Sequence, residues 1–316
     1  MAGMKDSARD RFPAYLSFAS RIRLQARKVY RQSLTRLQEQ AARRRPLDPL
    51  LAAGPPAAPW GQDGVNPPNA LTKCARWVDE DLVHPDVKAV AEGIRALRAD
   101  LDRRGLRYTN TAGNFLLRQY DPQYEPGKMW ENAWVIRHAD IRRGQRALDI
   151  GGASTLFSFY LAHLGCDVVV VDNDWSNCGI LDNARHVARA MGWRLAALDR
   201  NVSRPLPFPD ASFDRVFSIC VLEHLPSSLR QFLMREIGRV LTPGGIAGFT
   251  TDYDEARPVL TTDKGLRFAY KDKLERDVIR PSGLAVYGPT HWVDACPRES
   301  FLGAFFLQKP AAAGGA

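Results

Sequence analysis

The sequence predicts an α/β protein built on a doubly wound, mostly parallel sheet that a helical N-terminal extension precedes. Three observations predict this fold. From Arg146 onward, short apolar runs alternate with helical patterns, as they do in βαβ units. The run DVVVVD at 167–172 is β-branched almost throughout, which is typical of a parallel strand buried on both faces. Gly151 and Gly152 directly follow the first run, at 146–150, where such a sheet turns into its first helix.

Residues 1–45 form a basic arm. The arm holds 12 Lys+Arg against three Asp+Glu, so it carries all of the +9 formal charge of the 316-residue chain, and the remainder is neutral. Its apolar residues between Tyr15 and Ala41 recur at steps of three and four, which predicts an amphipathic helix. Such a helix suits peripheral contact with an anionic membrane or a protein partner. It equally suits packing on its own domain or a solvated extension.

A proline-rich linker at 46–69 follows the arm, and the prolines predict an extended connection. Residues 70–140 are expected to form a helical cap that leads into the sheet. The segment 84–105 places apolar residues at helical spacing and stops at a glycine. A second helix is predicted at 127–139, and we interpret its tryptophans as core or lid packing.

The sheet domain is expected over 141–310, with 311–316 as a disordered tail. Strands are predicted at 146–150, 167–172, 193–198, 212–220, 244–250 and 301–308. Helices are predicted at 154–165, 180–192 and 227–241. Ligands of such sheets bind beyond the carboxyl ends of the strands, so the residues directly after each strand are the candidate site residues.

The composition is that of a globular protein, with 45% hydrophobic and 25% charged residues. No apolar window approaches the length of about 20 residues that a membrane span needs. The five cysteines are scattered and show no CxxC spacing, which favours reduced thiols in the cytoplasm and argues against a metal site.

The loop after the first strand lacks the glycines that a dinucleotide requires. Counted from Gly151, the pattern G-x-G-x-x-G fails at Ala153 and Leu156. A Y-x-x-x-K sequence at 124–128 precedes the first strand and contains Pro and Gly, so it does not lie on the helix where dehydrogenases carry it. The sequence therefore disfavours a nicotinamide cofactor and favours a ligand without phosphates.

Four separated motifs resemble class I S-adenosylmethionine-dependent methyltransferases of the type 11-like kind. These motifs are LDIGGAST at 148–155, VVVVDND at 168–174, SFDRVFSICVLEHL at 212–225 and REIGRVLTPGGIAGFTT at 235–251. The resemblance implies a Rossmann-like, seven-stranded sheet with an antiparallel last strand, and S-adenosyl-L-methionine as the cofactor. Ala153 and Thr155 stand where the first motif of the family has glycines.

The resemblance implies cofactor contacts at the ends of the first two strands. Gly151 and Gly152 would let the backbone approach the methionyl part of the cofactor, and Asp149 would face its ammonium group. Asp149 can equally cap the loop amides. Asp172, followed by Asn173, ends the second strand at the spacing of an acid that accepts ribose hydroxyls.

The later strand ends supply the remaining candidates. Either Asp199 or Asn201 would contact the adenine, and the sequence does not choose between them. Cys220 ends the fourth strand, where the cofactor and acceptor sides of the family meet. Glu223 and His224 follow as catalytic candidates, because the pKa range of histidine suits a general base. The alternative is that this pair orders the loop.

The predicted function is a methyltransferase that acts on a small-molecule, lipid or saccharide acceptor. The alternative is a weakly active or inactive methyltransferase-like scaffold that its basic arm recruits. Nucleic acid is disfavoured as a partner, because the charge outside the arm is balanced and phosphate tracking needs a basic groove.

Overall fold

The structure is a computed structural model, and it describes residues 69–73, 81–109, 116–117, 125–173, 179–252, 274–291 and 302–311. The chain divides into two compact units, Met1–Asp48 and Pro49–Ala316, and every described residue belongs to the second. The basic arm, the linker up to residue 68 and the tail from residue 312 lie outside the described residues. Within the described ranges, no helix has the length and apolar character needed to cross a membrane.

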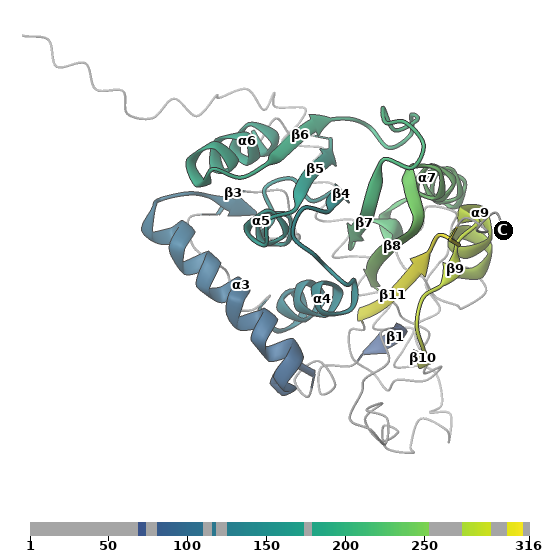
Figure 1. Cartoon of the computed structure of the whole chain (residues 1–316), viewed down its shortest axis with the longest axis horizontal. Helices are drawn as coiled ribbons and strands as arrows, with labels where there is room; N and C mark the ends of the chain where they lie inside the picture. Colours follow the sequence, from purple (N-terminus) through teal and green to yellow (C-terminus); the bar gives the residue numbers. More distant parts are fainter. Residues whose placement is uncertain are drawn as a thin grey trace, which may run out of the picture. The chain divides into compact units, whose positions relative to one another are not determined.

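A nine-stranded sheet forms the centre of the described unit (Figure 1). Its hydrogen-bonded order is β10-β1-β11-β8-β7-β4-β5-β6, and β9 also pairs with β11. The strands are β1 (Asn69–Lys73), β4 (Arg146–Ile150), β5 (Asp167–Asp172), β6 (Leu195–Asp199), β7 (Phe213–Ile219), β8 (Leu241–Asp252), β9 (Ala285–Val286), β10 (Thr290–His291) and β11 (Leu302–Gln308). Strands β4 to β8 pair in parallel, and β11 runs antiparallel to β8. The predicted mostly parallel sheet with an antiparallel last strand is confirmed.

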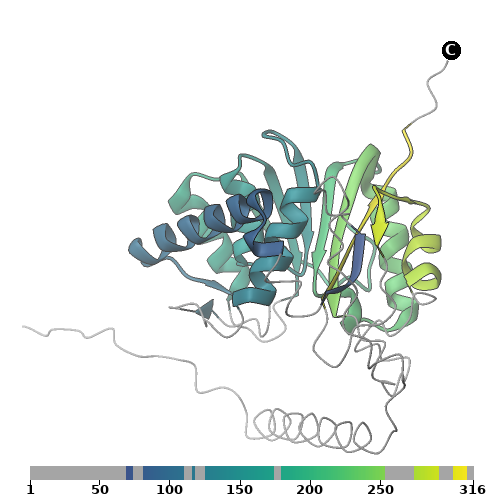
Figure 2. The ribbon, with the colours of Figure 1, turned by 90° about the horizontal axis from the view of Figure 1, so that it is seen from below.

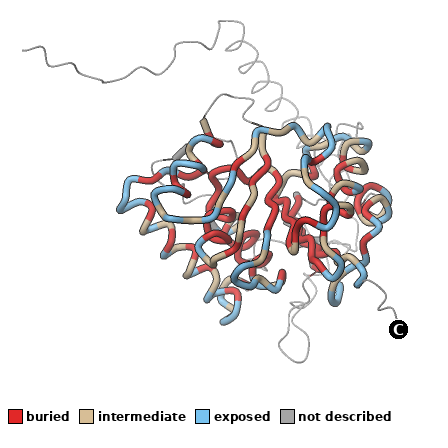
Figure 3. The backbone as a smooth tube through the Cα atoms, turned by 45° about the horizontal axis from the view of Figure 1, so that its top comes forward, coloured by how far each residue is buried: buried red, intermediate tan, exposed pale blue. Residues whose placement is uncertain are grey.

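Helices cover both faces of the sheet, each over its own hydrophobic cluster (Figure 2). One face carries α3 (Pro85–Arg103), α4 (Glu125–His138), α5 (Leu156–His163) and α6 (Ile180–Met191). The other face carries α7 (Ser227–Val240), the π-helical turn η4 (Glu275–Ile279) and α9 (Arg280–Ser282). Buried residues follow the central strands and the inner sides of these helices, whereas exposed residues lie on the periphery (Figure 3).

The cap helix α4 is buried along most of its length. All residues from 129 to 136 are buried, including Glu131 and Asn132. Trp130 and Trp134 stack with ring centroids 5.4 Å apart, and the Trp130 indole N–H donates to Asp81 Oδ2 at 2.8 Å. The tryptophans therefore form core packing between the cap and the sheet.

The edge beyond β11 contains β1, β9 and β10, which the sequence did not predict. β1 and β9 both pair antiparallel with β11, at Leu302–Ala304 and at Leu307–Gln308. Asn69 is fully buried and fastens this edge: its Nδ2 donates to the carbonyl oxygens of residues 287–289, and its Oδ1 accepts the Phe306 amide at 2.7 Å. The last residue of the expected linker is thus part of the sheet.

Candidate functional site

The candidate residues converge at the carboxyl edge of the sheet. Ile150 at the end of β4 pairs with Val171, and Asp172 at the end of β5 pairs with Asp199 at the end of β6. In a doubly wound sheet this edge, at the point where the strand order reverses between β4 and β7, is where ligands bind.

The loop after β4 requires glycine at both positions. Gly151 has φ +83°, a conformation that side chains rarely adopt, and a Cβ there would lie 2.5 Å from Val221 Cγ2. A Cβ on Gly152 would lie 1.8 Å from Asp149 Oδ2. The loop backbone therefore lies directly on Asp149 and against the residue that follows Cys220.

The two residues that depart from the glycines of the family have structural contacts of their own. The Ala153 amide donates to Asp172 Oδ2 at 3.1 Å, which ties the loop to the end of β5. Thr155 is the N-cap of α5, and its Oγ1 accepts the Ser158 amide at 3.2 Å and donates to the Gly152 carbonyl at 2.9 Å. These contacts hold the loop in place without further glycines.

Asp149 lies beneath this loop with an incomplete set of partners. It is 1% exposed, and its Oδ1 has no hydrogen-bond partner among the described residues. Ser158 Oγ lies 2.5 Å from Asp149 Oδ2 and 2.6 Å from the Gly152 carbonyl oxygen. One hydroxyl proton cannot serve both acceptors, so a protonated Asp149 completes the arrangement. Burial raises the pKa of Asp149 to about 7. The hydrogen bond from Ser158 opposes this rise, and the nearby Asp172 carboxylate adds to it.

Asp172 is half-buried and accepts a backbone amide on each carboxylate oxygen. Besides the Ala153 amide on Oδ2, the Asn173 amide donates to Oδ1 at 2.7 Å. Asp199 lies beside it and is exposed. Asn201 is also exposed, and its Oδ1 accepts the Ser203 amide at 2.9 Å, so this oxygen already forms a local turn.

The turn after β7 places the two catalytic candidates differently. The His224 side chain is 56% exposed, whereas Glu223 is fully buried, and His224 Nε2 lies 3.9 Å from Glu223 Oε1. Arg230 fastens the turn, because its Nη1 donates to the Leu225 carbonyl at 2.7 Å and its Nη2 donates to buried Asp277 at 2.7 Å. The exposed imidazole can meet a ligand, and the buried carboxylate belongs to the interior of the turn.

A polar cluster that the sequence did not reveal lies behind Cys220. Cys220 has φ +53° and its thiol donates to Glu131 Oε1 at 2.5 Å. Thr250 Oγ1 also donates to Glu131 Oε1, at 3.1 Å. Lys128 Nζ lies 2.7 Å from Glu131 Oε2 and donates to Cys220 Sγ at 3.0 Å. We call Lys128, Glu131, Cys220 and Thr250 the α4 cluster. In the sequence, only the position of Glu131 next to Trp130 in the predicted helix 127–139 pointed to a carboxylate among apolar residues, and nothing there indicated its partners.

Comparison with known proteins agrees with this geometry. Residues 148–249 match a family model described as a methyltransferase domain. A sterol 24-C-methyltransferase of Eremothecium gossypii is 30% identical over 172 residues, which cover 48% of this chain and 43% of that protein. A 27-O-demethylrifamycin SV methyltransferase of Amycolatopsis mediterranei is 34% identical over 112 residues, which cover 33% and 38% of the two chains. The chain thus spans less than half the length of these relatives.

Among solved structures, the [4+2]-cyclase SpnF is 18% identical, with a TM-score of 0.49 over 77% of this chain and 99% of that one. The matched segment covers most of the chain from β4 to β8, which contains the glycine loop and the strand ends described above. Residues 148–249 thus match a methyltransferase domain, and the resemblance found in the sequence is confirmed. The alternative of a scaffold without transferase activity finds no support in these comparisons.

Proposed function

We propose that the chain transfers a methyl group from S-adenosylmethionine to a small-molecule, lipid or saccharide acceptor. The observation that carries the proposal is the glycine loop, which lies on Asp149 and is tied to Asp172 at the carboxyl edge. The bound cofactor supplies a methyl group on a positively charged sulfonium. The residues present fit such a ligand, because the Ala153 amide serves Asp172 and is not offered to a phosphate.

Asp172 is the proposed ribose-binding residue. A carboxylate has about four acceptor positions, so it can accept ribose hydroxyls in addition to the two backbone amides. These amides also hold the carboxylate in one orientation, which lowers the cost of ordering it when a ligand binds. Asn173, whose amide supplies one of these contacts, directly follows β5.

For the adenine contact, the geometry favours Asp199 over Asn201. Asp199 is the register partner of Asp172 and is exposed at the same edge. The Asn201 oxygen already accepts the Ser203 amide at 2.9 Å. The Asp199 carboxylate can accept a hydrogen bond from the exocyclic amine of adenine.

His224 is the proposed general base, and Glu223 positions its turn. His224 is exposed next to the end of β7 and has the residue type that takes a proton near neutral pH. Glu223 is fully buried and cannot touch an acceptor without a rearrangement of the turn. Replacement of His224 by Gln should lower turnover by about 10²–10⁴-fold and leave cofactor affinity intact. Near-normal turnover would assign His224 to loop structure.

The names of the relatives support an acceptor of low molecular weight. They are a sterol methyltransferase and a methyltransferase of demethylrifamycin. Nucleic acid stays a disfavoured partner, because the charge outside residues 1–45 is balanced.

For residues 1–45 we propose peripheral contact with anionic lipid. Vesicle flotation tests this contact, and a matched protein lacking residues 1–68 keeps Asn69 and with it the edge of the sheet. Basic residues near an anionic surface contribute about 1 kcal/mol each, so the full chain should float and the shortened protein should not. Equal flotation of both proteins would contradict the proposal.

Methyl transfer itself is tested by incubating the full chain with isotopically labelled S-adenosylmethionine and panels of sterols, macrolide-like metabolites and saccharides. Mass spectrometry should detect a labelled methyl group on one class of acceptor, and the His224→Gln protein is the matched control. Failure of every panel, together with no binding of the cofactor, would contradict the proposed function.

A further inference from the structure

We propose that Lys128 of the cap helix α4 binds the carboxylate at the amino-acid end of the cofactor, and that Glu131 orients the Lys128 ammonium for this contact. The inference rests on the proposed function, since it concerns the same ligand. It assigns a binding residue that precedes the segment 148–249 that matches the methyltransferase family model.

The strand order gives the bound ligand a direction. Asp172 and Asp199, the proposed nucleoside contacts, end β5 and β6 on one side of β4. Cys220 follows β7 on the other side of β4. A ligand whose nucleoside lies over β5 and β6 and crosses the Gly151 loop must therefore extend its amino-acid end toward β7.

The Lys128 ammonium lies at that position. It donates to Cys220 Sγ at 3.0 Å, and Cys220 directly precedes Val221, whose methyl group covers Gly151. The backbone amide of Cys220 donates to the Thr250 carbonyl at 3.1 Å, so the end of β8 fixes this turn as well. The ammonium is thus held one residue away from the side chain that contacts the glycine loop.

The hydrogen-bond geometry leaves Lys128 able to take a ligand. An ammonium group has three N–H donors. Within the described residues, one N–H donates to Cys220 Sγ, the ammonium forms an ion pair with Glu131 Oε2 at 2.7 Å, and the side chain is 18% exposed. A further donor can meet a carboxylate that arrives from the solvent side.

Glu131 keeps this cation in place. Its side chain is fully buried, and its Oε1 accepts the Cys220 thiol and the Thr250 hydroxyl, while Oε2 pairs with Lys128. Burial alone would favour a neutral Lys128, but the Glu131 carboxylate and Cys220 outweigh it and raise the pKa of Lys128 above its usual range. The pair therefore presents a charged and oriented donor, which suits an anionic group rather than a neutral one.

Two nucleosides test the inference directly. S-adenosylhomocysteine has the amino-acid end, and 5′-methylthioadenosine lacks it. Lys128→Met should weaken S-adenosylhomocysteine about 10- to 100-fold in calorimetry, as expected for a lost charge-assisted hydrogen bond, and should change 5′-methylthioadenosine by less than about two-fold. Lys88→Met removes an exposed lysine of α3 and is the matched control, with unchanged affinity for both.

Removal of Lys128 alone leaves Glu131 buried without its cation, so a second variant guards against misfolding. The double variant Lys128→Met/Glu131→Gln removes both charges and should unfold cooperatively and show the same selective loss. Equal weakening of both nucleosides, or no weakening of either, would overturn the inference. If the unaltered protein bound neither nucleoside, the proposed function itself would fail, which is a separate outcome.

Discussion

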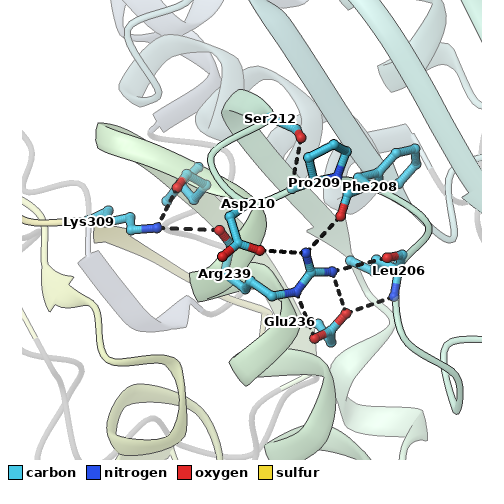
Figure 4. A network of polar contacts seen from close by, with 9 residues as sticks. Leu206, Phe208, Pro209, Asp210, Ser212, Glu236, Arg239 and Lys309 are labelled. Carbon is cyan, nitrogen blue, oxygen red and sulfur yellow. Dashed lines mark hydrogen bonds and ion pairs between the residues drawn. The ribbon is translucent and has the colours of Figure 1, made fainter.

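Two polar networks of the same sheet differ in how fully their hydrogen bonds are satisfied: the Arg239 clamp, formed by Arg239 with Glu236, Asp210 and two loop carbonyls, and the Asp149 site beneath the glycine loop. Arg239 of α7 makes five hydrogen bonds, to Glu236, Asp210 and the carbonyls of Leu206 and Phe208 (Figure 4). A guanidinium has five N–H donors, so the clamp is complete. It holds the loop that leads from β6 to β7 and needs no further partner.

At the carboxyl edge the arrangement is incomplete. Asp149 Oδ1 is buried without a hydrogen-bond partner among the described residues. Ser158 Oγ lies within 2.6 Å of two acceptors but has one proton to donate, so this contact needs a proton on Asp149 as well. A buried polar group without a hydrogen-bond partner costs free energy. Such a group is expected where a bound ligand supplies the missing partner. The contrast is therefore between a guanidinium whose donors are all used and a carboxylate oxygen beneath the glycine loop that has no hydrogen-bond partner among the described residues.

The largest expected effect concerns the pH dependence of stability. The pKa of Asp149 is raised from 3.8 to about 7 in the folded state. Between these values the folded protein keeps a proton that the unfolded chain loses, so stability falls as the pH rises from 4 through 7. The full contribution is at most about 4 kcal/mol. Asp149→Asn should remove this slope, as measured by thermal unfolding at pH 5 and pH 8.

Asp182→Asn on α6 is the control for this measurement. Asp182 is exposed and pairs with Arg185 at the surface, so its replacement should leave the pH profile unchanged. An Asp149→Asn protein with the same slope as the unaltered protein would show that Asp149 is ionised in the folded state, and the contrast with the Arg239 clamp would weaken.

The next effect concerns the contact between the loop and Asp149. Gly152→Ala should lower the free energy of unfolding by about 1–3 kcal/mol and abolish cofactor binding, because the new methyl group meets Asp149 Oδ2. Gly192→Ala is a control for general loss of stability. Gly192 caps α6 with φ +67° and has open space around it, so this variant should lose stability but bind the cofactor normally. Tight cofactor binding by Gly152→Ala would contradict the assigned loop.

The smallest of these effects belongs to the clamp. Arg239→Met should destabilise the fold by about 1–2 kcal/mol, since the side chain is 29% exposed and solvent screens part of its interactions. Cofactor affinity should not change, because the clamp is complete without a ligand. Denaturant unfolding and calorimetry on the same sample measure both quantities. A clear loss of affinity at normal stability would place the clamp in the site.

Features carried by neighbouring residues could be predicted from the sequence. Strands β4 to β8 and β11 were predicted because each shows its own apolar run, and Gly151 and Asp172 because they lie at strand ends at a fixed spacing. β1 was not predicted, since the partners of Asn69 lie more than 200 residues away. The α4 cluster was missed for the same reason: Glu131 meets Cys220 and Thr250 across separations of 89 and 119 residues. Contacts of this kind leave no local pattern.

Asp149 illustrates the limit within a single motif. Its position beneath the loop follows from the spacing of LDIGG. Its raised pKa comes from full burial and from the nearby Asp172 carboxylate, and it persists against the hydrogen bond from Ser158 in the first turn of α5. This shift in the pKa of Asp149 can be inferred only when the burial of the carboxyl group and its distances to neighbouring atoms are known.

Cofactor calorimetry with an altered Asp172 tests the central claim most directly. Asp172 and Asp167 are acids at opposite ends of β5, and Asp167 pairs with Arg194 at the far end. We predict that Asp172→Ala weakens S-adenosylhomocysteine by about 1–3 kcal/mol and that Asp167→Ala leaves its affinity unchanged. Unchanged affinity in Asp172→Ala, or equal losses in both proteins, would contradict the assignment of the carboxyl edge as the cofactor site.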